Sequence, residues 1–497
     1  MSSQSYDVIV IGGGAVGENA ADRTAQGGLR TVVVENDLVG GECSYWACMP
    51  SKALLRSGAA LAAAKRVPGA AEAVTGTVDV RAALKQRDSI ASHWKDDGQA
   101  KWLESAGIDL VRGHARLTGT KEVTVTAVDG TVTVLTATHA IVVSTGSASL
   151  LPDIPGVQDV EPWTSRDATS AQEIPRRLAV IGGGVVAAEM AAAYASLGST
   201  VTVIARSPLL GGQEPFAGEL VTAALRRSGV TVLVGRSTTE AHRAADGTVV
   251  LTLDDDSTVS AEKVLVATGR IPRTHDLGLE MVGLEPGDWL SVDDTMLVQG
   301  DSPVLAGDWL YATGDVNHRA LLTHQGKYQA RAAGDAIVTR AAGSPIDTAP
   351  WGAHVATADH AAVPQVTFTD PEVASVGLTA ASAVKAGHRI RILDYDLANL
   401  GGASVLAVGY VGKARAIVDL DREVLLGVTF VGQDVAELLH SATVAIVGEV
   451  PINRLWHAVP SYPTLSEVWL RLLEAYGRPG LTDNDTDTKD ENEDENE

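Results

Sequence analysis

The chain contains two cysteines, Cys43 and Cys48, which lie five positions apart among 497 residues. Two cysteines are often no more than buried, inert thiols. A single close pair in a glycine-rich loop, with no other cysteine in the chain, is instead typical of a redox-active pair. Pro50 suits the first turn of a helix. Cys48 is therefore expected near a helix N-terminus, where the helix dipole and Lys52 would lower its thiol pKa.

A glycine-rich turn near the N-terminus has the pattern of a dinucleotide-binding fold. An apolar run from Tyr6 leads into Gly12-x-Gly14-x-x-Gly17, a helical stretch follows, and a second apolar run ends at Glu35. The motif alone is weak evidence, but its place between a strand and a helix, with an acid after the next strand, indicates a nucleotide site. The glycines permit the tight turn, the helix N-terminus faces a pyrophosphate, and Glu35 accepts from a ribose hydroxyl.

The same pattern occurs a second time, which predicts two nucleotides bound by one chain. An apolar run from Arg177 is followed by Gly182, Gly184 and the small residue Ala187. The next apolar run ends in Arg206 rather than in an acid. An acid at this place binds the ribose 2′-hydroxyl of NAD, whereas an arginine suits the 2′-phosphate of NADP. The second fold therefore favours NADPH, with NADH as the alternative.

Together these motifs resemble the pyridine nucleotide–disulfide oxidoreductases, which include dihydrolipoamide dehydrogenase, glutathione reductase and mercuric reductase. The resemblance spans residues 6–477 and also rests on the Thr-Gly turns that end several strands and on the segment 368–377. It implies FAD, with Cys48 as the thiol against the flavin and Cys43 as the thiol that attacks the acceptor. It further implies a Lys52–Glu189 pair close to the flavin and a homodimer.

Further cofactor contacts are expected at turns that follow short apolar runs. Asp315 at a strand end can hold a ribityl hydroxyl of the flavin, whereas for Thr145 ordinary turn chemistry stays an open alternative. Besides Gly12, Gly14, Gly17 and Glu35, the expected FAD contacts are Gly41, Lys52, Thr145, Gly146, Gly314 and Asp315. Besides Gly182, Gly184, Ala187 and Arg206, the expected NAD(P) contacts are Gly269 and Arg270.

One segment departs from the family. Its disulfide reductases carry a His-Pro-Thr-x-x-Glu segment whose histidine protonates the leaving thiolate, and here Tyr462 stands in the place of that histidine, followed by Glu467. Imidazole titrates near ~6.5 and phenol near ~10, so a tyrosine exchanges protons less readily at neutral pH. His457 could substitute only if the loop bends unusually. A tyrosine before proline is similar to the soluble pyridine nucleotide transhydrogenase, which lacks the second cysteine.

The predicted function is an FAD-dependent oxidoreductase that passes electrons from NADPH or NADH through the cysteine pair to a small acceptor. The intact pair favours a disulfide as that acceptor, whereas Tyr462 favours a quinone reductase or transhydrogenase-like enzyme. The expected catalytic residues are Cys43, Cys48, Lys52, Glu189, Tyr462 and Glu467. A flavin-binding subunit without activity is disfavoured, because binding alone does not need Lys52 and Glu189. The additional C-terminal cysteine pair with which mercuric reductase handles its metal has no counterpart here.

The predicted fold class is α/β, with two Rossmann-like domains for FAD and NAD(P) and a C-terminal α+β dimerisation domain. The expected divisions are 1–153 and 276–349 for the FAD-binding domain, 154–275 for the NAD(P)-binding domain and 350–480 for the interface domain. From about residue 350, short alternating runs, such as 365–368, 414–418 and 425–431, predict an antiparallel sheet. Residues 481–497, almost without apolar side chains, are expected to be a disordered tail.

Composition excludes several classes of partner. The net charge is −23, and nine acidic residues and one lysine lie between Asp483 and Glu497. The electrostatic field of such an acidic protein does not attract nucleic acid or an anionic membrane. No run approaches the ~20 apolar residues of a membrane span. We expect no signal peptide and no metal site, and a cytoplasmic protein.

Overall fold

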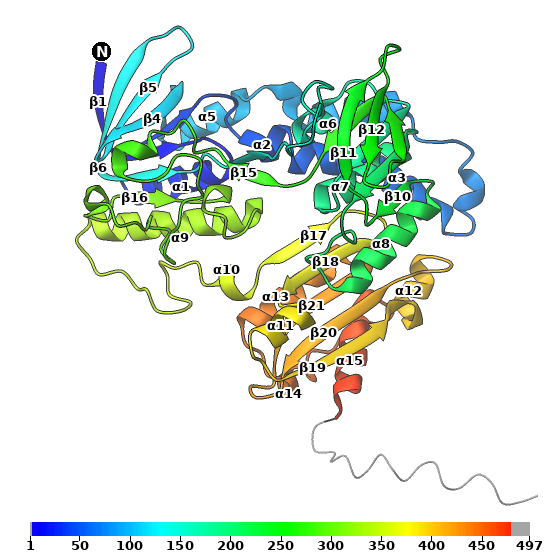
Figure 1. Ribbon diagram of the computed structural model, residues 1–497. Helices are drawn as coiled ribbons and strands as arrows, with labels where there is room; N and C mark the ends of the chain where they lie inside the picture. Colours follow the sequence, from blue (N-terminus) through cyan, green and yellow to red (C-terminus); the bar gives the residue numbers. More distant parts are fainter. Residues whose placement is uncertain (1, 479–497) are drawn as a thin grey trace, which may run out of the picture. The chain divides into compact units, whose positions relative to one another are not determined.

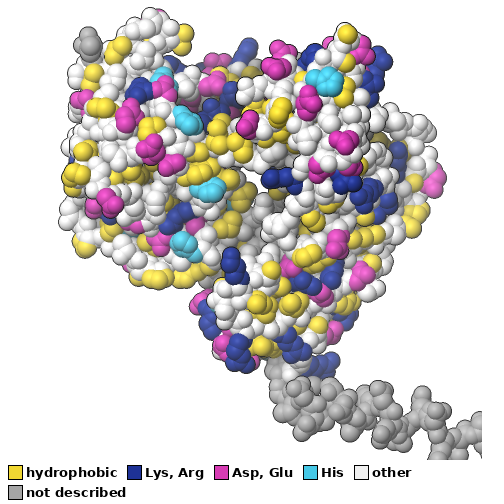
Figure 2. Space-filling view, viewed as in Figure 1, with side chains coloured by type: hydrophobic (Ala, Val, Ile, Leu, Met, Phe, Trp, Pro, Cys, Tyr) yellow, Lys and Arg dark blue, Asp and Glu magenta, His cyan; other side chains and the backbone are white. Residues whose placement is uncertain are grey.

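The computed structural model describes residues 2–478. The chain folds into two compact units, of which the first comprises Met1–Ala62, Thr75–Gly211 and Val221–Val363, and the second comprises Ala63–Val74, Gly212–Leu220 and Pro364–Glu497. The expected acidic tail, 481–497, lies outside the described residues. No helix in the described part of the chain is long and apolar enough to cross a membrane. Basic and acidic side chains are interspersed over the visible surface of both units (Figure 2).

A parallel sheet forms the centre of the first nucleotide-binding fold. Its strands lie in the order β3-β2-β1-β6, with β16 on the far side of β6. All five residues of β2 are buried, as expected of a parallel strand covered on both faces. An antiparallel β4-β5-β6 meander continues from the long strand β6. The bounds are β1 (Ser2–Ile11), β2 (Thr31–Glu35), β3 (Asp109–Arg112), β4 (His114–Gly119), β5 (Glu122–Thr126), β6 (Val132–Val143) and β16 (Leu310–Ala312).

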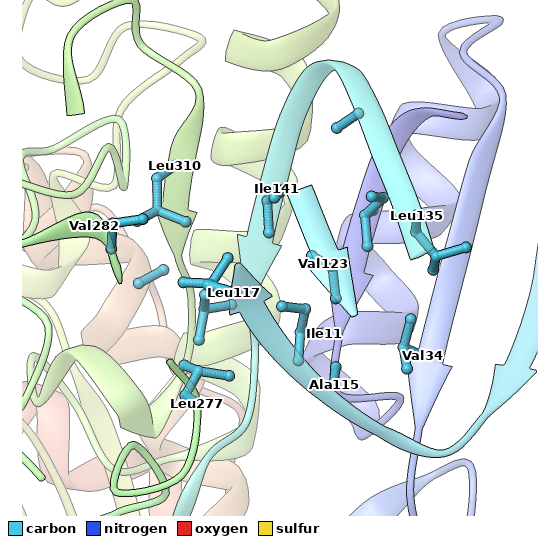
Figure 3. Packing of buried hydrophobic residues seen from close by; sticks show 14 of the residues in the cluster. Ile11, Val34, Ala115, Leu117, Val123, Leu135, Ile141, Leu277, Val282 and Leu310 are labelled. Carbon is cyan, nitrogen blue, oxygen red and sulfur yellow. The ribbon is translucent and has the colours of Figure 1, made fainter. Parts of the chain in front are cut away.

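Two different layers cover the faces of this sheet. One face carries α1 (Ala15–Gln26) and α9 (Thr323–Ala341), which pack on Val8, Val10 and Val33 and lie beside each other in Figure 1. The other face packs against the meander and the chain around Leu277 and Val282, and this core is drawn in Figure 3. Alternate side chains of β1 therefore pack into two separate hydrophobic cores, one on each face of the sheet.

Helices α2 (Gly41–Tyr45) and α3 (Cys48–Lys65) follow β2 and carry the two cysteines. Further helices of this part are α4 (Val80–Ile90), α5 (Asp97–Ser105) and α6 (Ser165–Ser170). Arg87 on α4 is fully buried and donates to the carbonyl oxygens of Thr169 and Ala171. This buried guanidinium ties α4 to the end of α6.

The second nucleotide-binding fold has its own parallel sheet, β10-β9-β8-β14, followed in the chain by an antiparallel meander, β11-β12-β13. A short antiparallel ladder of β7 and β15 links the two folds and pairs Ser149 with Arg270. The bounds are β7 (Ser147–Ser149), β8 (Arg177–Ile181), α7 (Val185–Ser196), β9 (Thr200–Ala205), α8 (Pro215–Arg227), β10 (Thr231–Val234), β11 (Thr238–Arg243), β12 (Val249–Leu253), β13 (Thr258–Ala261), β14 (Lys263–Val266) and β15 (Arg270–Pro272).

The second unit contains a five-stranded antiparallel sheet in the order β17-β18-β21-β20-β19. Every residue of the central strand β21 is buried, which places apolar cover on both faces of the sheet. The bounds are β17 (Pro364–Thr367), β18 (Glu372–Gly377), α11 (Ala380–Lys385), β19 (Ile390–Asp396), α12 (Gly401–Leu406), β20 (Lys413–Asp419), β21 (Val424–Gly432), α13 (Leu439–Val447), α14 (Ile452–Leu455) and α15 (Val468–Tyr476).

The predicted fold class is confirmed: two α/β nucleotide-binding folds precede an α+β unit. The predicted domain divisions stay predictions. The main segment of the second unit starts at Pro364, not at residue 350, because the chain before it is held to α9. There Asp359 on α10 (Ala358–Ala361) accepts hydrogen bonds from Gln325 and Gln329.

Candidate active site

The first glycine motif forms the tight turn that its sequence predicts. Gly12 has φ +100°, and a Cβ there would lie 2.5 Å from the carbonyl oxygen of Ser144. A Cβ on Gly17 would overlap the carbonyl oxygen of Gly12. The Glu35 carboxylate accepts from the backbone N–H of Gly13 at 2.6 Å and of Asp37 at 2.7 Å. Burial raises the pKa of Glu35, and these two backbone hydrogen bonds oppose the rise.

A cavity of about 410 Å³ connects this motif with the cysteine loop. Its lining includes most of the expected FAD contacts, namely Gly12, Gly14, Glu35, Gly41, Thr145, Gly146, Gly314 and Asp315, and also Cys43. The hydroxyl of Thr145 is buried without a hydrogen-bond partner. The glycines leave their backbone accessible, and the Thr145 hydroxyl and the Asp315 carboxylate can form hydrogen bonds. These groups fit an extended dinucleotide such as FAD.

Asp315 holds a polar contact network inside this cavity. Ser147 Oγ donates to its carboxylate at 2.5 Å, and the Arg270 Nε lies 3.6 Å from the same oxygen. Arg270 also donates to the Ser147 carbonyl oxygen at 2.9 Å. Arg270, which the sequence predicts to contact the nicotinamide nucleotide, lies on β15 and lines the cavity of the first fold; its contact with that nucleotide stays a prediction. The ladder between β7 and β15 brings Arg270 to this cavity.

The two cysteines occupy neighbouring helices, with Cys43 on α2 and Cys48 as the first residue of α3. A hydrogen bond with Cys43 lowers the pKa of the Cys48 thiol to about 6, assisted by Thr323 and Lys52 and opposed by burial. Thr323 Oγ1 lies 3.3 Å from Cys48 Sγ. The same hydrogen bond between the cysteines, with burial, raises the pKa of Cys43. Cys48 is therefore the more acidic thiol of the pair.

The structure brings Lys52 and Glu189 together. Lys52 on α3 donates to Glu189 Oε2 on α7 at 2.8 Å. The Glu189 side chain is only 4% exposed, so its charge needs the ammonium group. This ion pair joins the helix that begins at Cys48 to the helix that follows the second glycine motif.

The second glycine motif repeats the geometry of the first. Gly182 has φ +136°, and a Cβ there would overlap the carbonyl oxygen of Ala267. Gly184 precedes α7 and Ala187 is fully buried in its first turn. Arg206 directly follows β9 and is exposed, so its guanidinium is accessible to a phosphate. Gly269 adopts φ +155° before β15.

Tyr462 and Glu467 lie together in the second unit, around the start of α12. A Cβ on Gly401 would lie 3.1 Å from the Tyr462 ring and 3.4 Å from Glu467 Oε2. Glu467 is buried and accepts from the backbone N–H of Gly402 at 3.2 Å. Tyr462 is 78% exposed. The carboxylate is thus held by backbone, and the phenol faces outward.

Family comparisons agree with this arrangement. The model of the pyridine nucleotide-disulphide oxidoreductases matches residues 6–334, and that of the family's dimerisation domain matches residues 363–472. The chain belongs to this family. Membership makes it a flavoprotein oxidoreductase that acts on disulfides with FAD and a pyridine nucleotide.

Similar proteins span nearly the whole chain. The dihydrolipoyl dehydrogenase of Thermus scotoductus is 32% identical over 96% of this chain and 99% of that protein. The mercuric reductase of Staphylococcus aureus is 29% identical over 93% of this chain and 81% of that protein. The structure of the HOCl-induced flavoprotein disulfide reductase RclA from Escherichia coli, as its Cu(II) complex, matches with TM-score 0.80 and 21% identity over 95% of this chain and 99% of that chain. This last likeness shows the fold.

Sequence reasoning missed two contact residues of the candidate site and one buried acid beside the first glycine motif. Ser147 contacts Asp315, and Thr323 contacts Cys48. Glu18, in the first turn of α1, carries a buried carboxylate oxygen without a hydrogen-bond partner. A threonine at a helix start is a recognisable signal, but nothing local links it to a cysteine 275 residues away. Glu18 directly follows the first glycine motif. An acidic residue in the first turn of a helix is ordinarily explained by its favourable interaction with the helix dipole.

Proposed function

We propose that this enzyme is a homodimer that reduces a small disulfide with NADPH, using Cys43 and Cys48 as its redox pair. The observation that carries the proposal is the asymmetry of the two thiols beside the cavity of about 410 Å³. The hydrogen bond from Cys43 lowers the pKa of Cys48 to about 6, so Cys48 is a thiolate at neutral pH. A thiolate is the form that exchanges electrons with a flavin or attacks a disulfide.

The cysteines complete the transfer in two exchanges. FAD, when bound, supplies a two-electron carrier between the nicotinamide and the cysteine pair. The Cys43 thiolate attacks the acceptor disulfide, so that a mixed disulfide forms and one acceptor thiolate leaves. The Cys48 thiolate then attacks Cys43 Sγ, which re-forms the Cys43–Cys48 disulfide and releases the second thiolate. Two electrons pass to the acceptor, and its two thiolates take up two protons.

Arg206 supports NADPH as the electron donor. It follows β9 of the second fold, where an acid would repel a 2′-phosphate, and Ala205 before it is buried and uncharged. Its exposed guanidinium can donate charge-assisted hydrogen bonds to that phosphate.

Exposed apolar side chains of the second unit support a homodimer. Val405 is 73% exposed, Val408 67%, Val444 54% and Val459 85%. These residues lie within the match to the dimerisation domain, and apolar side chains left this open are typical of an interface. A second subunit would cover them and bring its Tyr462 segment to an active site.

A quinone is the second candidate acceptor, favoured by Tyr462. Phenols titrate near ~10, and the Glu467 carboxylate is engaged by Gly402 rather than by the phenol. An acceptor that takes electrons without releasing a thiolate does not need the missing histidine. Trp46, between the cysteines, lines the cavity and stacks under Arg166, and offers an aromatic surface to a planar acceptor.

An acceptor panel tests both candidates. Lipoamide, glutathione disulfide and a naphthoquinone are offered to the FAD-loaded wild type, to Cys43→Ser and to Ser44→Ala, which controls for disturbance of the loop. We expect disulfide turnover in the wild type and in Ser44→Ala, and its loss in Cys43→Ser. Disulfide turnover that survives in Cys43→Ser would contradict the proposal. Quinone turnover alone, equal in all three proteins, would establish the second candidate.

A further inference from the structure

One part of the cavity of the first fold is lined by a cluster of charged and aromatic side chains. The cluster consists of Asp37, Glu42, Trp46, Arg166 and Arg273, all of which line the cavity. They come from four stretches of the chain, namely the turn after β2, α2 with the residue that follows it, α6, and the turn after β15. Neither arginine belongs to a glycine motif or to the cysteine pair.

Arg166 lies at the centre of this cluster. Its Cζ lies 3.7 Å from the centroid of the Trp46 ring, which is a cation–π contact. Its Nε and Nη2 donate to Glu42 Oε1 at 3.2 and 3.0 Å, and its Nη1 donates to Asp37 Oδ2 at 3.1 Å. The guanidinium group therefore uses its planar face on an indole and its edges on two carboxylates.

The helix that carries Arg166 is fixed by buried contacts one turn further on. Thr169 Oγ1 donates to the carbonyl oxygen of Trp46 at 2.7 Å, and the Tyr194 hydroxyl donates to the carbonyl oxygen of Ala168 at 2.7 Å. Ala168 and Thr169 are both buried. Arg166 and Thr169 are three residues apart and so lie on one face of α6. The base of α6 is thus held in place, and Arg166 extends from it to the cluster.

The contacts that Arg166 makes are exposed and can break at little cost. The exposed fractions of the side chains are 37% for Arg166, 46% for Asp37 and 27% for Glu42, and ion pairs this exposed contribute little to stability. Arg273 Nη2 also donates to Glu42 Oε1, at 3.0 Å. If Arg166 moves away, Glu42 therefore keeps a cationic partner and Asp37 can be hydrated. No uncompensated buried carboxylate opposes the movement.

The two carboxylates belong to stretches that are expected to contact the nucleotide. Asp37 lies two residues after Glu35, the expected ribose contact, and Glu42 lies between Gly41, an expected FAD contact, and Cys43. Side chains that line the cavity and are also this exposed lie at its rim. Arg166 therefore ties two parts of the rim together.

We propose that Arg166 and Trp46 form a latch at the rim of this cavity, which must open for FAD to enter or leave. The latch is closed when the guanidinium group stacks on the indole and binds both carboxylates, and open when Arg166 swings into solvent. Opening also uncovers the indole face that a planar acceptor would use. This inference rests on FAD occupying the cavity and does not depend on the acceptor.

A latch has a different kinetic effect from a direct contact with FAD. All of its partners belong to the protein, so it closes equally in the free and the FAD-loaded protein. It therefore slows association and dissociation by the same factor and leaves Kd unchanged. A group that binds FAD directly would instead slow dissociation and lower Kd.

The test measures FAD exchange in the holoenzyme and FAD binding by the apoprotein prepared from it. Exchange is followed by adding excess ¹³C-labelled FAD and determining the mass of the bound flavin over time. Association is followed by the loss of FAD fluorescence. Both are applied to the wild type, Arg166→Met, Trp46→Leu, the double variant and the control Arg30→Met. Arg30 also stacks on a ring, 4.4 Å from the centroid of Tyr6, and lies 3.5 Å from Asp109, but it is outside the cavity lining.

Arg166→Met is expected to speed both association and dissociation about five- to twentyfold, with Kd within about twofold of the wild type. Trp46→Leu should act in the same direction. The double variant should be no faster than the faster single variant, because no latch is left to remove. Salt at about 1 M, with a screening length of about 3 Å, should speed exchange in the wild type but not in Arg166→Met. Arg30→Met should match the wild type.

Unchanged exchange in Arg166→Met would overturn the proposal, as would faster dissociation at an unchanged association rate, which would make Arg166 a direct FAD contact. Effects of the two single variants that multiply in the double variant would also overturn it, as would an Arg166→Met protein that takes up no FAD. Should the apoprotein fail to rebind FAD, the double variant and the salt dependence of exchange decide in the holoenzyme. No readout uses an acceptor, so a wild type without disulfide turnover would refute the proposed function and leave the latch to be decided by these rates.

Discussion

The hydroxyl of Thr323 is expected to control the charge of the Cys48 thiol, which we propose lies against the flavin. Thr323 Oγ1 lies 3.3 Å from Cys48 Sγ and is one of the groups that, after the hydrogen bond from Cys43, lower the pKa of Cys48 to about 6. Thr323→Val removes the hydroxyl and keeps the branched shape. A hydrogen bond to a charged group contributes about 1.5–3 kcal/mol, which corresponds to about one to two pKa units. We expect the variant to titrate at about 7 to 8.

The assay is a pH titration of the long-wavelength absorbance that the Cys48 thiolate makes with oxidised FAD in the two-electron-reduced enzyme. Acid protonates the thiolate and removes the band, so a raised pKa means that the band disappears at higher pH. Thr323→Ser keeps the hydroxyl and should titrate like the wild type. Thr339→Val, which removes a hydroxyl that bonds His354 at 3.0 Å elsewhere on α9, should also be unchanged.

Two results would refute this reasoning. A midpoint in Thr323→Val that coincides with that of the wild type would mean that the hydroxyl does not stabilise the thiolate. A shift of the same size in Thr323→Ser would assign the effect to side-chain packing rather than to the hydrogen bond. An enzyme that forms no such band at all on two-electron reduction would place the thiolate away from the flavin.

Three further outcomes are expected. Gly17→Ala should be purified without FAD, because its Cβ overlaps the Gly12 carbonyl oxygen, whereas Gly98→Ala, with open space around it, should stay yellow. Arg206→Ala should lose about tenfold of any kcat/KM preference for NADPH over NADH, and an unchanged ratio would make Arg206 a solvated surface residue. Tyr462→His should reduce disulfides faster than the wild type, with a pH profile near that of imidazole. A variant that is no faster than the wild type would contradict this expectation.

Much of this fold could be predicted from local patterns. The two glycine motifs, the buried runs that became β1, β2, β8 and β9, and the cysteine loop each depend on residues close in sequence. In the second unit the predicted runs at 365–368, 414–418 and 425–431 correspond to β17, β20 and β21. The prediction did not include β18 and β19. Ile392 on β19 is 44% exposed, and the strand alternates too weakly to stand out from its turns.

The contacts that tune the site could not be predicted in the same way, because they join distant segments. Thr323 reaches Cys48 only because α9 packs beside α1, and Arg270 lines the cavity of the first fold only because β15 pairs with β7. A pattern within one segment predicts what that segment becomes. It carries no information on which other segment supplies its hydrogen-bond partners.

Tyr462 bears on the supply of protons during disulfide reduction. Disulfide reduction requires a proton for each thiolate that leaves, and the segment that supplies it in the family's reductases has a phenol here. The hydrogen bond with Cys48 and burial raise the pKa of the Cys43 thiol. Another group must therefore accept its proton before Cys43 attacks a disulfide. Phenols titrate near ~10, so Tyr462 exchanges a proton less readily at neutral pH than an imidazole would.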